Sequence, residues 1–271
     1  MCQGEGDTAR ARCTFGPDGK LYVSAGSSCN ICAEEDPRRA AILRVDPDGS
    51  IPSDNPFAAD PDPRRRALWA WGLRNSVDFL FTRGGQLWAD HNGSDGMGDD
   101  VPPEEIIIEV QKGRHHGWPY CYTPTLGANL PPNQAAEARD DRLPLPVGFD
   151  CTEAVPALFT DLAHSAPLGM ALGRSSAFPA EYRDDFFVAF HGSWNMTTEG
   201  IRDCKVQRIV IENGRPVRSE DFANGWRAEG RPCGDAASFG RPASVIFGAD
   251  GAMYVSDDAA GRVYRLVCVG R

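Results

Sequence analysis

The pattern of apolar and polar positions repeats along the chain. A short apolar segment ends in an aromatic residue, a turn that contains glycine follows, and a second apolar segment comes next. This unit occurs as FGPDGKLYVS from Phe15, as FTRGGQLWAD from Phe81 and as FGADGAMYVS from Phe247. The turns contain Gly19, Gly85 and Gly251, and glycine adopts the positive φ of a tight turn without strain. The pattern therefore predicts three β-hairpins of the same design.

More strands are predicted beside these hairpins. Third strands follow at Ala40 to Gly49 and at Gly261 to Val269, and DDFFVAFHG with CKVQRIVIENG predicts one more hairpin pair. Helical periodicity is scarce, and 29 glycines and 21 prolines are typical of short strands joined by loops. Antiparallel units that recur about every 40 to 65 residues indicate an all-β fold, a β-propeller rather than a sandwich. The strands suffice for about four blades, and we expect a single domain over residues 1–271.

A long segment interrupts the strand pattern. Residues 122–156 contain almost no alternation of apolar and polar positions. Loops of this length are usually functional or disordered. We interpret this one as an excursion over the surface, and disorder is the alternative.

Composition narrows the classes of function. The 271 residues have a net charge of −10, with 38 acidic residues against 28 basic ones. This balance argues against a nucleic-acid partner, because binding to phosphates requires a basic face. No apolar run is long enough to span a bilayer, and the N-terminal MCQGEGDTAR lacks a signal segment. Taken alone, this N-terminus predicts a cytoplasmic protein, whereas nine cysteines are typical of an oxidising compartment.

The cysteines predict bridges. Cys29 and Cys32 form a CNIC motif, which is interpreted as a local disulfide, a pair of reduced thiols, or a redox or metal motif. Two further candidate bridges are Cys121 with Cys151 and Cys204 with Cys233. Sequence alone does not define the connectivity, and an odd count leaves one cysteine unpaired if the others are bridged.

Two arginines precede predicted inner strands. Arg74 and Asn75 come before VDFLF, and Arg241 comes before the last hairpin in the same way. In a propeller such positions face one end of the central channel. An arginine there can hold a carboxylate through two hydrogen bonds, and an amide can bind a carbonyl group. Two such arginines are expected to converge on an anionic ligand, and the alternative is that each braces a turn.

A polar loop and several histidines are further candidates. Residues 89–106 are rich in Asp, Asn and Gly, which suits Ca²⁺, although the spacing is not that of an EF-hand and a solvated acidic loop is the alternative. His164 and His191 are isolated, and isolated histidines are more often structural. His115 and His116 are interpreted as part of a packed turn. The chain lacks the GxSxG, Walker and dinucleotide motifs, which argues against hydrolase and NAD-dependent classes.

These segments together resemble a known family. The chain contains, in this order, FGPDGKLYVSAGSSCNIC, DPRRAAILRVDPDGS, GLRNSVDFLF, LWADHNGSDGMGDDVPPEEI, HHGWPYCY, HSAPLGM, AFHGSWN and FGADGAMYVSDDAAGRVYRL. The combination resembles the soluble sugar dehydrogenases that depend on pyrroloquinoline quinone (PQQ), of the L-sorbosone dehydrogenase and soluble quinoprotein glucose dehydrogenase type. It covers nearly the whole chain.

The resemblance implies a six-bladed propeller, PQQ and Ca²⁺ as cofactors, a sugar substrate, an external electron acceptor and a periplasmic or secreted location. It implies that Arg74 and Asn75 contact PQQ and that Arg241 is a cation beside the cofactor. The backbone carbonyls of Gly93 and Ser94 would help to hold Ca²⁺. His164 matches a family position near the cofactor pocket.

Two departures from the family concern the N-terminal end. Relatives are longer, so the chain is expected to be N-terminally incomplete. The family's catalytic base is a histidine seven residues ahead of Phe15, often preceded by Asp, and here Asp7 and Thr8 occupy these positions. Threonine does not act as a base near neutral pH, whereas histidine does. The predicted function is therefore a sugar dehydrogenase, impaired in this chain, and the alternative is a non-catalytic propeller that binds sugar or another partner.

Overall fold

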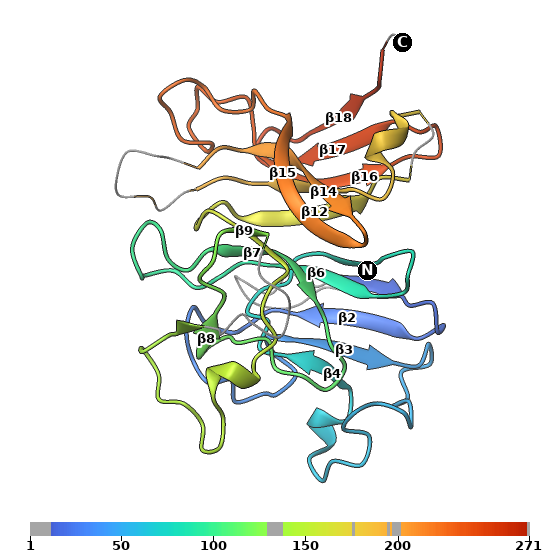
Figure 1. Cartoon of the computed structure of the whole chain (residues 1–271), viewed down its shortest axis with the longest axis vertical. Helices are drawn as coiled ribbons and strands as arrows, with labels where there is room; N and C mark the ends of the chain where they lie inside the picture. The colour runs from blue at the N-terminus through green and yellow to red at the C-terminus, as the bar shows by residue number, and fades with distance from the viewer. Residues whose placement is uncertain (1–11, 129–137, 175–176, 194–195, 197–201, 270–271) are drawn as a thin grey trace.

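The structure is a computed structural model that describes residues 12–128, 138–174, 177–193, 196 and 202–269. Three short 3-10 helices occur in this part of the chain: η1 (Pro63–Arg65), η2 (Cys151–Glu153) and η3 (Ala180–Tyr182). Almost all other regular structure in this part of the chain consists of antiparallel strands, which form four larger sheets along the long axis of the molecule and one sheet of two short strands (Figure 1). The all-β propeller fold and its strands for about four blades are as predicted.

Each sheet is built mainly from strands that follow one another in the chain. The first contains β1 (Cys13–Phe15), β2 (Leu21–Ala25), β3 (Ala41–Val45) and β4 (Leu68–Trp71). The second contains β5 (Phe79–Phe81), β6 (Leu87–His91), β7 (Glu104–Glu109), β11 (Phe159–Asp161) and β9 (Gly127–Ala128). The third contains β12 (Pro167–Leu172), β13 (Phe186–Phe190), β14 (Lys205–Glu212) and β15 (Arg215–Ala223). The fourth contains β16 (Pro242–Phe247), β17 (Met253–Asp257) and β18 (Arg262–Leu266).

The predicted hairpins are confirmed. They are β1–β2, β5–β6 and β16–β17, with Phe15 opposite Leu21, Phe81 opposite Leu87 and Phe247 opposite Met253. The turn glycines have φ values of 73° at Gly19, 83° at Gly85 and 81° at Gly251. Residues with a Cβ atom rarely adopt this conformation, so glycine sets these turns. The further pair in the third sheet is β13 with β14, and the predicted third strands are β3 and β18.

Residues 122–156 are only partly the strand-free loop that the sequence predicted. Two short strands occur there, β9 and β10 (Ala138–Arg139), and β10 pairs with β8 (Cys121–Tyr122). β9 pairs with β11 and extends the second sheet. Two-residue strands have too few positions to show alternation, which explains why the pattern missed them. Residues 129–137 lie outside the described residues.

The core lies between consecutive sheets. β13 has the apolar sequence FFVAF, in which Phe186, Val188 and Phe190 pack toward the second sheet. The alternate residues Phe187 and Ala189 belong to the cluster shared with the fourth sheet. Successive side chains of a strand point to opposite faces, so a run without polar residues indicates a strand that is buried on both sides. Packing of this kind connects each sheet to the next.

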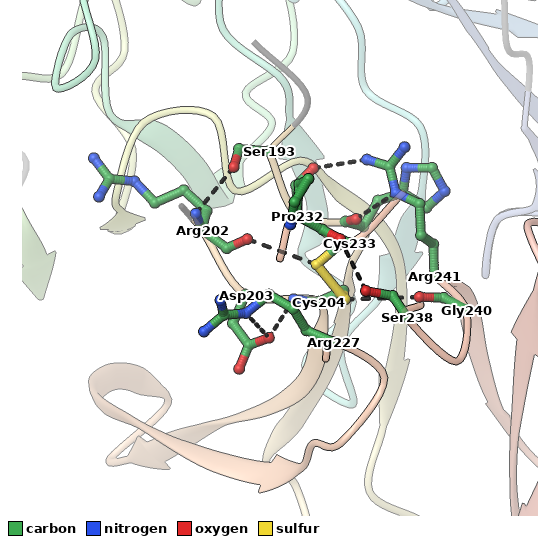
Figure 2. Close-up of a disulfide and its surroundings, with 12 residues drawn as sticks. Ser193, Arg202, Asp203, Cys204, Arg227, Pro232, Cys233, Ser238, Gly240 and Arg241 are labelled. Carbon is green, nitrogen blue, oxygen red and sulfur yellow. Dashed lines mark hydrogen bonds and ion pairs between the residues drawn. A yellow bond between two sulfur atoms is a disulfide. The ribbon is translucent and has the colours of Figure 1, made fainter. Parts of the chain in front are cut away.

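Three predicted disulfides are present. They join Cys29 with Cys32, Cys121 with Cys151 and Cys204 with Cys233. The CNIC motif is therefore a local bridge, and Cys268 is a free thiol among the described residues. The Cys204–Cys233 bridge is tightly enclosed (Figure 2): a Cβ atom on Gly192, which has φ 77°, would lie 2.6 Å from Cys233 Sγ. Only glycine fits this close approach without a shift of its surroundings.

The order of strands gathers particular loops at one end of the molecule. Because the first two strands of each sheet are antiparallel, the loop before the first strand and the loop after the second lie at the same end. The first strands β1, β5, β12 and β16 also line a common groove of about 390 Å³. The candidate residues around 74, 92, 164, 191 and 241 all occupy loops of this kind.

We expect the packing between sheets to dominate stability. Phe186 is 1% exposed and stacks on Trp88 of the second sheet with ring centroids 4.8 Å apart. Phe186→Ala should lower the free energy of unfolding by about 3–5 kcal/mol, because it removes a buried ring and leaves a cavity. Phe15→Ala is the control, since Phe15 is 61% exposed, and it should change stability by less than about 1 kcal/mol. Urea denaturation measures both, and equal losses would contradict this account of the core.

Candidate functional site

Arg74 is the centre of a polar cluster at the loop end. Its side chain is 12% exposed, and it donates from Nη1 to the carbonyl oxygen of Gly93 at 2.6 Å. Its Nε and Nη2 atoms donate to the backbone oxygen and the side-chain oxygen of Asn30, at 3.2 and 3.1 Å. Asp95 Oδ2 lies 3.6 Å from Nη2. Burial lowers the pKa of Arg74, the nearby Asp95 opposes this, and the guanidinium remains charged.

Asn30 lies inside the loop that the Cys29–Cys32 disulfide closes, and it links two loops. Its Nδ2 donates to the backbone oxygen of Asp95 at 2.9 Å, and its Oδ1 accepts from the Asp95 amide at 2.8 Å. The disulfide restricts this loop, so Asn30 holds both Arg74 and the 93–95 segment in fixed positions.

His91 holds the backbone of Arg74 through a hydrogen bond. Its Nε2 accepts a hydrogen bond from the backbone N–H of Arg74 at 2.8 Å, and its Nδ1 lies 2.7 Å from Glu105 Oε2. An acceptor nitrogen carries no proton, so the proton of His91 resides on Nδ1 and is donated to Glu105. His91 is therefore a structural residue that orients the loop before β5.

Asp95 joins His164 to Arg74. Its Oδ1 lies 3.3 Å from His164 Nδ1, and His164 Nε2 lies 2.8 Å from the carbonyl oxygen of Gly98. The hydrogen bond with Asp95 raises the pKa of His164 above its ordinary value. Its backbone has φ 64°, a conformation that few residues other than glycine adopt. The fold therefore holds His164 in a strained conformation and toward a carboxylate, which favours the imidazolium form.

Glu104 is a buried carboxyl beneath the same loop. Its Oε2 accepts from the amide of Gly93 at 2.9 Å, and its Oε1 accepts from the amide of Ala166 at 3.3 Å. Burial raises the pKa of Glu104 to about 7, although these hydrogen bonds oppose the shift. A cation placed nearby would stabilise the ionised form.

The remaining predicted residues lie in two places: Asn75 and Ser94 are beside this cluster in the chain, and Arg241 lies with His191 and Gly192. Asn75 follows Arg74, and its Oδ1 is buried with no hydrogen-bond partner within the described ranges. Ser94 Oγ accepts from Arg142 at 2.6 Å. Arg241 donates from Nε to the carbonyl of His191 and from Nη2 to that of Gly192, both at 2.8 Å (Figure 2 shows this arginine).

The structure thus links Arg74 to His164 through Asp95, and it links Arg74 to the carbonyl of Gly93 directly. Arg241 instead donates to the carbonyls of His191 and Gly192, and it lies beside the enclosed Cys204–Cys233 bridge. Asp7 and Thr8 lie outside the described residues. Sequence reasoning did not single out Asn30, Asp95 or Glu104. The loop rich in Asp, Asn and Gly contained the last two, and the CNIC motif contained the first.

The chemistry of these groups fits both cofactors that the resemblance implies. Hard cations such as Ca²⁺ take oxygen ligands, and the carbonyl of Gly93, the free amide oxygen of Asn75 and the carboxylate of Asp95 supply them. Arg74 supplies a fork of donors for an anionic group. Because Arg74 donates to the carbonyl of Gly93 here, a cation at that oxygen requires the guanidinium to turn toward another acceptor.

The fold and site define a class: a β-propeller that gathers arginine, histidine, carboxylates and carbonyl oxygens at one end. Residues 11–268 match the family model described as TrAA12-like, and the chain belongs to that family.

Known proteins support this assignment. The aldose sugar dehydrogenase YliI of Escherichia coli is 27% identical over 213 residues, which cover 76% of this chain and 52% of that protein. The holo form of the pyranose dehydrogenase PQQ domain from Coprinopsis cinerea has a TM-score of 0.70 at 22% identity, with coverage of 97% and 70%. The calcium structure of the Trichoderma reesei family AA12 protein has a TM-score of 0.69 at 21% identity, with coverage of 96% and 68%.

The chain spans about half the length of the curated relatives that it matches. In the part of the chain that the structure describes, no helix has the length and apolar character needed to cross a membrane.

The pairing of His164 with Asp95 predicts a pH effect. Asp95→Asn should lower the pKa of His164, because it removes the carboxylate that stabilises the imidazolium. Any stability from this pair is complete below the ordinary imidazole pKa and is lost as the pH rises through the raised value. Titration of the His164 ring protons by NMR measures the shift.

Asp258→Asn is the matched control, since Asp258 lies 2.7 Å from a different histidine, His191. An unchanged His164 pKa in Asp95→Asn, or an equal shift in the control, would show that Asp95 does not hold this imidazolium.

Proposed function

We propose that this chain forms the cofactor-holding end of a sugar dehydrogenase that uses PQQ and Ca²⁺. The protein would oxidise an aldose or a sorbosone-like sugar and pass the electrons to an external acceptor. We also propose that residues 1–271 act as one partial propeller domain. The observation that carries the proposal is a connected polar cluster at the loop end of a TrAA12-like chain: Asp95 pairs with Arg74 and His164, and Arg74 also donates to the carbonyl of Gly93.

The bound groups would supply the redox chemistry: the quinone would supply the hydride acceptor, and Ca²⁺ would supply Lewis-acid polarisation of its carbonyl. Arg74 would bind and orient an anionic or carbonyl group, and its position is already held by Asn30 and His91. Asn75 would donate or accept through an amide whose oxygen has no partner among the described residues. Such preorganised groups stabilise developing charge without rearrangement during the reaction.

The electrostatics of the cluster suit a divalent cation. Glu104 accepts a hydrogen bond from the amide of Gly93, Asp95 lies 3.6 Å from Arg74, and the pKa of Glu104 is raised to about 7 because its charge is buried. A cation near the Gly93 carbonyl would offset this cost and keep Glu104 ionised. His164 would keep a positive charge beside Asp95. This charge would weaken the hold of the Asp95 carboxylate on Arg74 and leave Arg74 available to an anionic ligand.

A periplasmic or secreted location belongs to the proposal. The three bridges Cys29–Cys32, Cys121–Cys151 and Cys204–Cys233 support it, because disulfides persist in oxidising compartments.

Arg74 provides the first test. The chain is incubated with PQQ and Ca²⁺, and binding is measured by calorimetry. Arg74→Gln should weaken PQQ binding by about 10- to 100-fold, because it removes charge-assisted hydrogen bonds to an anion.

Arg83→Gln is the control. Arg83 lies on the turn of the β5–β6 hairpin, is 57% exposed and pairs with Asp184. The control should bind PQQ as the natural chain does. A folded natural chain that fails to bind PQQ with Ca²⁺ would overturn the proposal for this chain.

Thr8 provides a test of catalysis. If Thr8 occupies the place of the family's base, Thr8→His should raise the rate of dye reduction with aldoses by about 10²- to 10⁴-fold. The affinity for PQQ should not change. Thr82→His, beside the exposed turn of residues 83–86, is the control and should leave the rate unaltered.

The same experiment separates the proposed enzyme from the alternative, a non-catalytic propeller that binds sugar. Thr8 in place of a histidine is the observation that favours this alternative. Sugar binding without dye reduction, in both the natural chain and Thr8→His, would support the binding module and reject the dehydrogenase.

A further inference from the structure

A separate cavity lies at the outer edge of the first sheet. It has a volume of about 470 Å³, which is within the range of pockets that bind small molecules. Residues 113–118 form one side of the cavity because they run along β4. The amide of Gly113 donates to the carbonyl oxygen of Trp69 at 2.7 Å, and the amide of His116 donates to the carbonyl oxygen of Trp71 at 2.8 Å. Residues 33–40 and 146–153 provide other parts of the lining.

Aromatic rings form much of the wall. His115 lies against Phe149, with centroids 4.6 Å apart, and meets Trp71 edge to face at 5.7 Å. Tyr120 packs 5.9 Å from Phe149. These four residues all line the cavity. Ring faces of this kind provide a large, rigid apolar surface for a flat ligand.

His115 contributes a hydrogen-bond donor. Its Nδ1 accepts from the amide of Gly117 at 2.9 Å, and burial lowers the pKa of the imidazole to about 4. The ring is therefore neutral with its proton on Nε2. Among the residues that the structure describes, Nε2 has no hydrogen-bond partner. The hydroxyl of Tyr120 likewise makes no hydrogen bond within the described part of the chain.

Arg39 contributes a positive charge. Three arginines line the cavity, and two of them are engaged: Arg65 pairs with Asp60 at 3.0 Å, and Arg114 donates to the carbonyl of Glu153 at 2.9 Å. The guanidinium of Arg39 has no hydrogen bond or ion pair with any described residue. A half-buried arginine without a partner is well suited to an external anion.

Glu34, the lining acid that is nearest to Arg39 in sequence, is bound to a partner other than Arg39. Both carboxylate oxygens of Glu34 accept hydrogen bonds from Ser28, at 2.6 Å from its amide and 2.7 Å from its hydroxyl. The cavity therefore combines aromatic walls with a guanidinium, an imidazole N–H and a phenol, all of which can donate to an acceptor.

We propose that this cavity binds a small monocarboxylate that carries a ring, either a sugar acid or an aromatic acid. The carboxylate is held by Arg39 and the Nε2–H of His115, and the ring lies against Phe149 and Trp71. Both sources share this chemistry, because the apolar face of a pyranose and the face of an arene pack on aromatic rings in the same way.

This site is distinct from the proposed cofactor site and independent of it. The two are separated by the loop that contains Asn30, whose carbonyl oxygen accepts from Arg74 on one side and from the indole of Trp118 on the other, at 3.2 and 3.3 Å. Trp118 lines the cavity, and Arg74 does not. Binding here requires neither PQQ nor Ca²⁺.

The test is direct binding to the whole chain without added cofactor. D-glucuronate, 4-hydroxybenzoate and uncharged D-glucose are titrated separately, by calorimetry and by saturation-transfer NMR. We expect at least one acid to bind, and its identity tells which source the cavity accepts. Arg39→Gln should weaken that binding by about tenfold or more, which is the worth of one charge-assisted hydrogen bond.

Arg38→Gln is the matched control, because the neighbouring Arg38 pairs with Asp36 on the exposed surface and does not line the cavity. It should leave the affinity within about twofold of the natural chain. Trp71→Phe keeps an aromatic wall and should retain binding, whereas Phe149→Ala should weaken it. Three outcomes would overturn the proposal: neither acid binds at about 10 mM, glucose binds as tightly as the acids, or Arg39→Gln binds like the natural chain.

Discussion

Each inner sheet of this propeller must bury both of its faces, because its strands carry apolar side chains on the two sides. Leu87 and Ala89 of β6 face the first sheet, while Trp88 between them faces the third. Phe186 and Phe187 of β13 divide between the second and fourth sheets in the same way. This packing sets the order of the sheets, and the order of the sheets decides which loops become neighbours.

The polar end follows from that arrangement. In each sheet, the loop before the first strand and the loop after the second strand lie at this end. Because these loops stack against those of the neighbouring sheets, charged groups from different sheets are partly withdrawn from water. Charges in such places need partners, since an isolated buried charge is costly. Arg74, Asp95 and His164 meet this need as a connected set, and Glu104 meets it only in part, which is why its pKa rises. A buried carboxyl that favours its neutral form would be stabilised as an anion by a nearby cation.

Local features of the fold could be predicted from particular residues. Gly19, Gly85 and Gly251 marked the hairpin turns, and the cysteine pairs 121 with 151 and 204 with 233 proved to be bridged. The short strands β9 and β10 could not be predicted, because two residues carry no periodicity and each strand forms only against a partner from elsewhere.

The candidate site was predictable in its residue types and only partly in its geometry. Arg74 stood out by its place before an inner strand, His164 stood out through the family resemblance, and the loop after β6 stood out by its acidic and glycine-rich composition. Which acid of that loop faces Arg74 was not predictable. The position at which the resemblance expects the family's base, Thr8, lies outside the described residues, so its role stays a prediction.

The sequence by itself determined the repeated hairpins, their turns and the family, because these depend on patterns within a few residues of one another. Only the tertiary structure decided that Asn30 binds Arg74 across a separation of 44 residues, and Asp95 across 65. It also decided that His164 and Arg74 share one carboxylate, and that Arg39 and His115 line one cavity. The physical reason is that such contacts depend on how whole sheets stack through apolar burial, and the apolar pattern within one strand does not specify which other sheet that strand will pack against.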